Sequence, residues 1–267
     1  MVDNVSVNSY AAAFWWDEGD NTNDLLVDRL AVLGVNPGDE YDGTARFDGA
    51  LLGSGLNVEI RNSVISGVCC NKLSTAFSWI SGGKAPDPVW IFERGNLAHN
   101  NTGPGARFWT NLKHDHTIFD YISYRNDEGG VQGGAYKNAV RYDDMLMVDD
   151  YVFQNASARV GASYTNFQVF NSLGPAFVVG KRNLGSDTHL PVEDCVLEAG
   201  AGHPKVYIKD GNNPWLAHFV RCGVTPDDIE FETLTGGNDG THILIDHEDG
   251  RKWEILVENG KKVVRDR

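Results

Sequence analysis

Short apolar segments that resemble one another recur along most of the chain, and the clearest copy is 56–67. Later copies, with apolar residues at the same offsets, lie at 90–97, 117–126, 146–155, 167–171 and 190–197 and around residue 220. Their equivalent residues, spaced 21 to 32 positions apart, are Ile60, Phe92, Phe119, Val148, Val169, Val192 and Val220. This pattern indicates a repeated strand-forming unit.

A second series of short apolar segments lies between the copies of the first. Its members are 77–80, 107–109, 138–141, 158–160, 177–179 and 206–208. Two short strands in roughly 20 to 30 residues, joined by loops of varying length, are typical of one coil of a β-helix. Coils stacked about 4.8 Å apart pair every strand with its neighbours and bury a continuous core.

A β-sandwich would also produce short strands at regular spacing with turn signals between them. The paired series favours the β-helix, and so do the residues that follow the strands. These are Gly67, Asn126, Asn155, Asn171 and Gly200. Glycine and asparagine accept the left-handed backbone conformation that a coil corner needs.

The two ends of the chain depart from the repeat. Leu26, Leu30 and Leu33 form a stripe at helical spacing, and polar residues at 23 and 24 can cap it, so the sequence predicts an amphipathic helix over 23–33. Such a helix would cover an open end of the solenoid.

At the other end, Glu-Asn-Gly-Lys (258–261) separates two β-rich runs. Asn-Gly between such runs is a strong signal for a type I′ hairpin. We therefore expect an all-β fold: a single-stranded parallel β-helix over 51–235, between an N-terminal segment with the capping helix (1–50) and a C-terminal antiparallel hairpin or meander (236–267).

The formal net charge of −14 argues against nucleic acid as a partner, because phosphates require a basic surface. We find no apolar window of the length that spans a membrane. The first residues lack a basic segment and become acidic where a secretory signal would be apolar, so no such signal is expected.

The four cysteines are Cys69, Cys70, Cys195 and Cys222. No C-x-x-C pair occurs, so a structural zinc site is not expected. Buried thiols are favoured over a disulfide framework. Cys195 and Cys222 nevertheless fall at similar places in successive repeats and could stack closely, and the sequence leaves open whether they are bonded.

Acidic residues follow the inward position in several repeats. Glu93, Asp120 and Asp149 would then face outward and stack on three consecutive coils. Their separations would approximate those of paired carboxylates in glycoside hydrolysis. Two alternatives remain open, namely that outward positions on a solvated sheet are simply polar, and that the carboxylates hold calcium. No other cofactor is expected.

Aromatic residues are plentiful, and aromatic faces beside polar groups suit sugar rings. The candidates for carbohydrate binding are Trp109, Tyr121 and Tyr151, although about half of the aromatic residues must belong to the core.

The coil pattern over residues 50–235 resembles the parallel β-helix superfamily, which contains pectate-lyase-like enzymes, polygalacturonase-like hydrolases and viral tailspikes. The resemblance implies right-handed winding. Asp143-Asp144 and Asp149-Asp150 match the D-D dipeptide of polygalacturonase-like enzymes, but the N-T-D, H-G and R-x-K motifs are missing. The catalytic residues of these families are therefore not transferable, since fold alone does not give function.

Two hypotheses follow. The first is a virion structural protein of the spike, fibre or turret type, a homo-oligomer and expected trimer beside other virion proteins, which attaches to host surface polysaccharide. The second is an extracellular polysaccharide lyase or glycoside hydrolase that uses the stacked carboxylates. A third option is a structural solenoid with no ligand. The absence of a recognisable secretory signal favours the first, and a virion or extracellular location is expected in either case.

Overall fold

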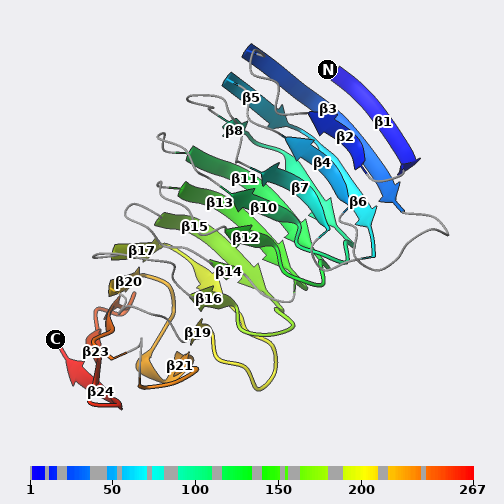
Figure 1. Cartoon of the computed structure of the whole chain (residues 1–267). Helices are drawn as coiled ribbons and strands as arrows, with labels where there is room; N and C mark the ends of the chain where they lie inside the picture. The colour runs from blue at the N-terminus through cyan, green and yellow to red at the C-terminus, as the bar shows by residue number, and fades with distance from the viewer. Residues whose placement is uncertain are drawn as a thin grey trace.

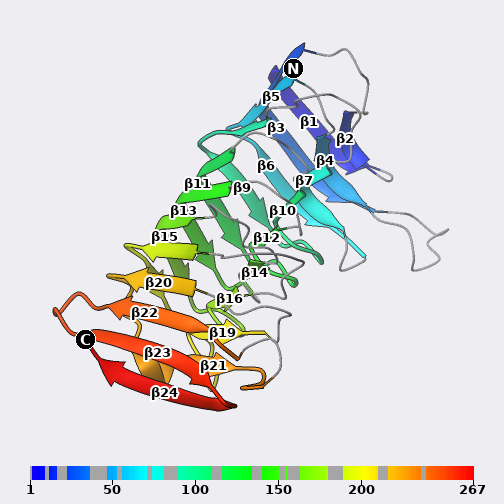
Figure 2. The same cartoon turned by 60° about the vertical axis from the view of Figure 1, so that its left-hand side comes forward.

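Two parallel β-sheets wind the chain into an elongated solenoid with the termini at opposite ends (Figure 1, Figure 2). The computed structural model describes residues 2–9, 12–16, 23–36, 47–52, 56–70, 74–80, 90–109, 116–133, 140–150, 154–155, 163–179, 189–209, 216–235 and 239–267. Within these ranges there is no α-helix, and the fold is all-β with one short 3-10 helix, η2 (Pro226–Asp228).

The first sheet contains the longer strands. They are β1 (Val2–Ser9), β3 (Asn23–Val35), β5 (Leu56–Arg61), β6 (Val64–Val68), β8 (Trp90–Phe92), β9 (Asn96–His99), β11 (His116–Tyr124), β13 (Val140–Val148), β15 (Ser163–Phe170), β17 (His189–Glu193), β18 (Val196–Leu197), β20 (Leu216–Val220), β22 (His242–Asp246), β23 (Lys252–Glu258) and β24 (Lys261–Asp266). All of their pairings are parallel up to β22.

The second sheet is shorter and entirely parallel. Its strands are β2 (Ala12–Trp16), β4 (Asp48–Leu52), β7 (Thr75–Ile80), β10 (Ala106–Trp109), β12 (Val131–Gly133), β14 (Gln154–Asn155), β16 (Phe177–Val179), β19 (Val206–Ile208) and β21 (Ile229–Phe231). The two sheets face each other across the core. The prediction of a parallel β-helix is thus confirmed at the level of the architecture.

The repeat is visible as a column of buried side chains, one from each coil. The column is Val27, Ile60, Phe92, Ile118, Tyr142, Tyr164, Val192, Phe219 and Ile245. Three of its members were predicted in register. Phe119 and Val220 were each one residue too late, and Val148 and Val169 belong to the second half of a longer strand.

From β1 to β20, the strands of the first sheet bend or end at a residue with a left-handed backbone. This first corner is formed by Arg29, Asn62, Gly95, Asp120, Asp144, Asn166, Asp194 and Arg221, all with positive φ. A second corner follows about five residues later and is formed by Gly34, Gly67, Asn100, Arg125, Asp149 and Asn171. Gly67 and Asn171 were predicted as corner residues, and both have positive φ. Asn126 was also predicted as a corner residue, but on its coil the residue with positive φ is Arg125, one position earlier.

The predicted capping helix over 23–33 is wrong, because these residues form β3. Leu30 points into the core and is 3% exposed, whereas Leu33 lies on the outer side and is 48% exposed. The strand has apolar residues on both sides of the sheet, with Asp28 and Arg29 at the corner. Two-sided apolar strands mimic helical spacing, as buried parallel strands often do.

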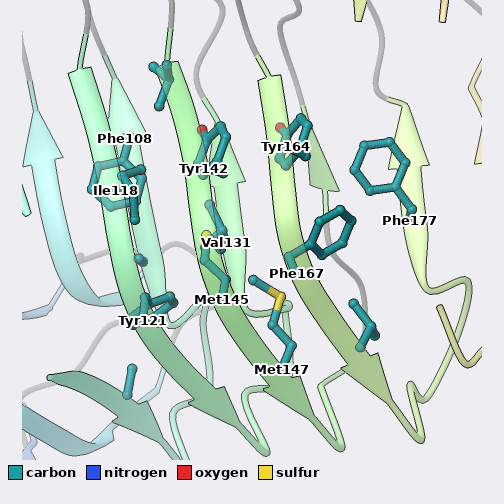
Figure 3. Packing of buried hydrophobic residues seen from close by; sticks show 14 of the residues in the cluster. Phe108, Ile118, Tyr121, Val131, Tyr142, Met145, Met147, Tyr164, Phe167 and Phe177 are labelled. Carbon is teal, nitrogen blue, oxygen red and sulfur yellow. The ribbon is translucent and has the colours of Figure 1, made fainter. Parts of the chain in front are cut away.

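Aromatic rings from successive coils contact one another within a core that is mostly aliphatic (Figure 3). Tyr142 and Tyr164 stack face to face with centroids 4.6 Å apart, and Phe177 meets Tyr164 edge-on at 5.1 Å. Phe92 packs edge-on against Phe108 with centroids 5.5 Å apart. Rings from both sheets therefore interlock, which fixes the distance between them.

The C-terminal end is closed as predicted by an antiparallel hairpin of β23 and β24, added to β22 at the edge of the first sheet. Asn259 and Gly260 both have positive φ, as a type I′ turn requires. Lys262 Nζ donates to the carbonyls of Pro226 and Ile229 at 2.6 and 2.9 Å, so the hairpin is held against the last coil.

All four cysteines form disulfides, and the interpretation as buried thiols is wrong. One disulfide joins the neighbours Cys69 and Cys70. The other joins Cys195 and Cys222, which lie on adjacent coils as their positions in the repeat suggested. Both of the latter residues are buried.

Candidate functional site

The three carboxylates predicted to stack do not share a column. Glu93 follows Phe92, which pairs with Ile118, so its neighbour on the next coil is Phe119. Asp120 occupies the first corner and Asp149 the second. The three side chains are therefore offset along the strands and do not form the single stacked column that the sequence predicted.

Asp149 has a clear structural role. Its Oδ1 accepts a hydrogen bond from Asn171 Nδ2 at 2.6 Å, and its Oδ2 lies 3.4 Å from Arg125 Nε. Arg125 and Asn171 occupy the same corner as Asp149 on the two adjacent coils. The left-handed corners favour polar residues such as asparagine and aspartate, and pairs of this kind satisfy the hydrogen-bonding groups of their side chains.

The carboxylate nearest to Asp120 in the register is Asp144. Both occupy the first corner on adjacent strands, between the residue pairs Phe119–Asp143 and Tyr121–Met145. Asp144 Oδ1 accepts a hydrogen bond from Asn166 Nδ2 at 3.0 Å. Among the described residues, no group of three or more histidine, cysteine or acidic side chains could hold a metal ion.

The three aromatic candidates also separate. Tyr121 is fully buried, its ring packs edge-on against Phe92, and its hydroxyl donates to the Gly130 carbonyl at 3.3 Å. It is a core residue and cannot stack on a sugar at the surface. Trp109 ends β10 and pairs with Ile80, and Tyr151 lies outside the described residues.

A ladder of buried polar side chains follows the second corner, and the sequence analysis did not predict it. It consists of Asn101, Asn126, Asp150 and Ser172, each directly after a corner residue. Asn101 Nδ2 donates to Asn126 Oδ1 at 2.7 Å, and Ser172 Oγ donates to the Asp150 carbonyl at 3.2 Å. The constant offset from the corner is the signal that could have located it.

Asp150 is the ionisable member of this ladder. Its Oδ1 accepts from the backbone N–H of Asn126 at 2.8 Å, and its Oδ2 accepts from Ser123 Oγ at 2.6 Å. Burial raises the pKa of Asp150 to about 7, because desolvation outweighs these hydrogen bonds. The carboxyl therefore titrates near neutral pH inside the core.

The outward side of the first sheet between the two corners is apolar, and we call it the outer apolar face. One row of it is Val5, Ala31, Val64, Leu97, Ile122, Leu146, Gln168 and Val196. The second row is Val7, Leu33, Ser66, His99, Tyr124, Val148 and Phe170. The rows cross β1, β3, β6, β9, β11, β13 and β15, which lie side by side in Figure 2, and the first row also reaches β18.

This face was missed because outward positions of a solvated sheet are expected to be polar. The signal was present in the sequence, since segments such as 25–35 are apolar at both odd and even positions. A sheet that has one side in the core and the other in water alternates instead. The outer apolar face is therefore the feature of this surface that most needs a functional explanation.

No helix in the described part of the chain has the length and apolar character that would be needed to cross a membrane. No family model, curated protein or solved structure matches the chain.

Proposed function

We propose that this chain is a structural protein of a virion surface projection, of the spike, fibre or turret type, which attaches to polysaccharide on a host surface. The observation that carries the proposal is the distribution of the acidic side chains. Glu93, Asp120 and Asp149 occupy different columns, and the corner carboxylates of Asp144 and Asp149 accept hydrogen bonds from the amides of Asn166 and Asn171. Asp120 and Asp144 are neighbours at the first corner, but Asp144 is held by Asn166, and a carboxylate engaged in this way suits a structural role better than acid or base catalysis.

The disulfides support a location outside the reducing cytoplasm. Disulfide bonds persist in oxidising environments, which include the surfaces of virions and cells. The chain carries two of them, and the one between Cys195 and Cys222 is buried in the solenoid. Right-handed winding and a homo-oligomer, expected to be a trimer, belong to the same proposal.

The net charge sets an expectation about the glycan. At −14 the chain repels polyanions, and screening by salt weakens this repulsion. Neutral or amino-sugar polysaccharides are therefore the favoured class. The partners at the protein's surface would be hydroxyl groups, which need hydrogen bonds and aromatic contact more than charge.

The test is to measure binding and cleavage together. The purified chain is immobilised and exposed to dextran, chitosan and polygalacturonate, while the size and reducing ends of each polymer are followed in solution. We expect binding to a neutral or amino-sugar polymer that stays intact. Shortening of any polymer would overturn the proposal, and loss of that cleavage in Asp120→Asn with Asp144→Asn would locate an enzyme at the first corner.

A further inference from the structure

Asn100 begins an acceptor pattern for N-linked glycosylation, Asn-x-Ser/Thr, because Asn101 and Thr102 follow it. The pattern is short and also occurs by chance, so the surroundings of the asparagine are needed to judge it. A glycan is bulky and is bonded to the side-chain nitrogen. The asparagine must therefore lie at the surface, and its amide must be free of the hydrogen bonds that hold the fold.

Asn100 lies at the surface, at the second corner directly after β9. It is exposed and has a φ of 55°, and its backbone N–H donates to the Tyr124 carbonyl at 3.2 Å. Thr102 is partly buried, and its backbone N–H donates to the Val68 carbonyl at 2.9 Å. The backbone of the acceptor pattern is thus anchored to the neighbouring coils, whereas Asn100 itself is accessible from outside.

The amide of Asn100 differs from those of the other asparagines at the corners. Three of these donate through Nδ2 to an aspartate on the preceding coil: Asn62 to Asp28 at 2.9 Å, Asn166 to Asp144 at 3.0 Å and Asn171 to Asp149 at 2.6 Å. None of the three has serine or threonine two positions later. Within the residues that the structure describes, the side-chain amide of Asn100 makes no hydrogen bond.

The neighbouring coils explain this difference. On the preceding coil the same corner is occupied by Gly67, since Ser66 pairs with His99, and a glycine offers no carboxylate to the amide. Apart from its chain neighbours, a Cβ built on Gly67 would have only atoms of Gly34 within 4 Å, so the space beside it is open. On the following coil the corner residue is Arg125, whose Nε lies 3.4 Å from an oxygen of Asp149.

Two further matches to the acceptor pattern begin at Asn4 and Asn155. Asn4 is partly buried, and its register partner Leu30 points into the core, so Asn4 lies on the inward side of β1. The side chain of Asn155 and the two residues after it lie outside the described residues. Asn100 is therefore the acceptor whose surroundings the structure supports.

The disulfides indicate a compartment in which this modification takes place. Disulfide bonds persist outside the reducing cytoplasm, and N-linked glycans belong to the surface loops of secreted proteins. The inference below rests on this part of the proposed function, namely the location. It does not depend on attachment to a polysaccharide.

We propose that Asn100 is a site of N-linked glycosylation, filled when the chain passes through a compartment that contains a lipid-linked oligosaccharide donor and its transferase. The transfer forms a bond between Asn100 Nδ2 and C1 of the first sugar. It breaks the bond between that C1 and a pyrophosphate oxygen of the donor, so the lipid pyrophosphate leaves and Nδ2 loses one proton. Among the described residues no hydrogen bond of the Asn100 side chain has to be broken.

The experiment secretes the full chain from cultured eukaryotic cells behind an added signal peptide. Trypsin cleaves after Arg94 and Arg107, so residues 95–107 are released as one peptide that contains Asn100 and neither of the other two acceptor patterns. Peptide N-glycosidase F in heavy-oxygen water converts a glycosylated asparagine to a labelled aspartate, which mass spectrometry locates. We expect the label at Asn100 in most copies of the wild type.

Thr102→Ala is the test variant, because it removes the acceptor pattern and keeps the asparagine. Thr102→Ser is the matched control, because it keeps the hydroxyl group that the pattern requires. The labelled peptide should disappear in the first variant and persist in the second. Asn100→Gln removes the site in a second way if Thr102→Ala is not secreted, and circular dichroism melts establish that each secreted variant is folded.

An unlabelled peptide 95–107 from the secreted wild type would overturn the inference. So would a label that persists in Thr102→Ala, because it would then arise from ordinary deamidation. Polysaccharide binding is measured on the same samples after the glycan has been removed. A chain that is glycosylated at Asn100 but binds no polysaccharide contradicts the proposed function and leaves this inference intact.

Discussion

Replacement of Asp150 by asparagine is expected to stabilise the protein at pH 8 and to leave its stability nearly unchanged at pH 4.5. The carboxyl is buried, and its pKa is raised from 3.8 to about 7 in the folded state. The folded protein therefore holds this proton more tightly than the unfolded chain does. Its contribution to stability is complete below about pH 4 and is lost as the pH rises through about 7.

The size of the effect follows from the difference between the two pKa values. Each unit corresponds to about 1.4 kcal/mol, so the wild type should lose about 4 kcal/mol of unfolding free energy between pH 4 and pH 8 through this group. Asparagine does not titrate, and its Oδ1 can still accept from the Asn126 N–H. The difference between the two proteins therefore isolates Asp150.

Other carboxyl groups change the stability with pH in the opposite direction, but they do so at lower pH. Hydrogen bonds from arginine or asparagine side chains lower the pKa values of Asp3, Asp28, Asp194 and Asp249. The stability that these groups contribute is complete above about pH 4 and is lost as the pH falls through their lowered folded-state pKa values. Above pH 4.5 they change little, so they do not obscure the titration of Asp150.

Urea denaturation of both proteins at several pH values between 4.5 and 8.5 is the measurement. Asp149→Asn is the control, because it makes the same chemical change one residue earlier at a corner that accepts asparagine. We expect the control to follow the wild-type curve. Equal pH dependence of the unfolding free energy in the wild type and in Asp150→Asn would show that the folded state does not raise the pKa of Asp150.

The sequence was sufficient for the architecture because each coil repeats the same inward position. Ile60, Phe92 and Val192 were in register, and the positive φ of Gly67 and Asn171 was expected from their residue types. The corner residues were harder to predict from the sequence, because arginine and aspartate also adopt the left-handed conformation here. A one-residue error in such a corner moves every later side chain to the other face.

That error explains the carboxylate column. The apolar repeat predicts Phe119 as the inward residue, although Ile118 is the buried one, and this error places Asp120 in an outward row. Asp149 was compared with Asp120 although the two lie at different corners. Apolar spacing alone cannot distinguish the two halves of a bent strand, because both halves contribute inward residues to one core.

The capping helix was wrong for a related reason. A chain that is apolar on both sides of a strand satisfies the helical pattern as well as the strand pattern, and length does not separate them when the strand is as long as β3. The same two-sided pattern is the origin of the outer apolar face. The failed helix prediction and the unexpected apolar face therefore come from one feature of the sequence.

Loss of the Cys195–Cys222 disulfide is expected to cost about 3.5 kcal/mol of unfolding free energy. The bond connects residues 27 positions apart, and a loop of that length restricts the unfolded chain by about this amount in the chain-entropy account. It also links two adjacent coils, because Cys195 lies between β17 and β18 and Cys222 lies just after β20. Cys195→Ala with Cys222→Ala should therefore unfold at a clearly lower denaturant concentration.

The second disulfide provides the matched control, since Cys69 and Cys70 are neighbours and their bond closes only a small ring with no residue between them. Cys69→Ala with Cys70→Ala makes the same chemical change and is expected to cost less than about 1 kcal/mol, because the loop term is absent. Guanidinium denaturation of both double variants and of the wild type, without reductant, gives the comparison. If Cys195→Ala with Cys222→Ala unfolds at the wild-type midpoint, the disulfide does not contribute to stability. The strand pairing between β17 and β20 would then be sufficient to hold these two coils together.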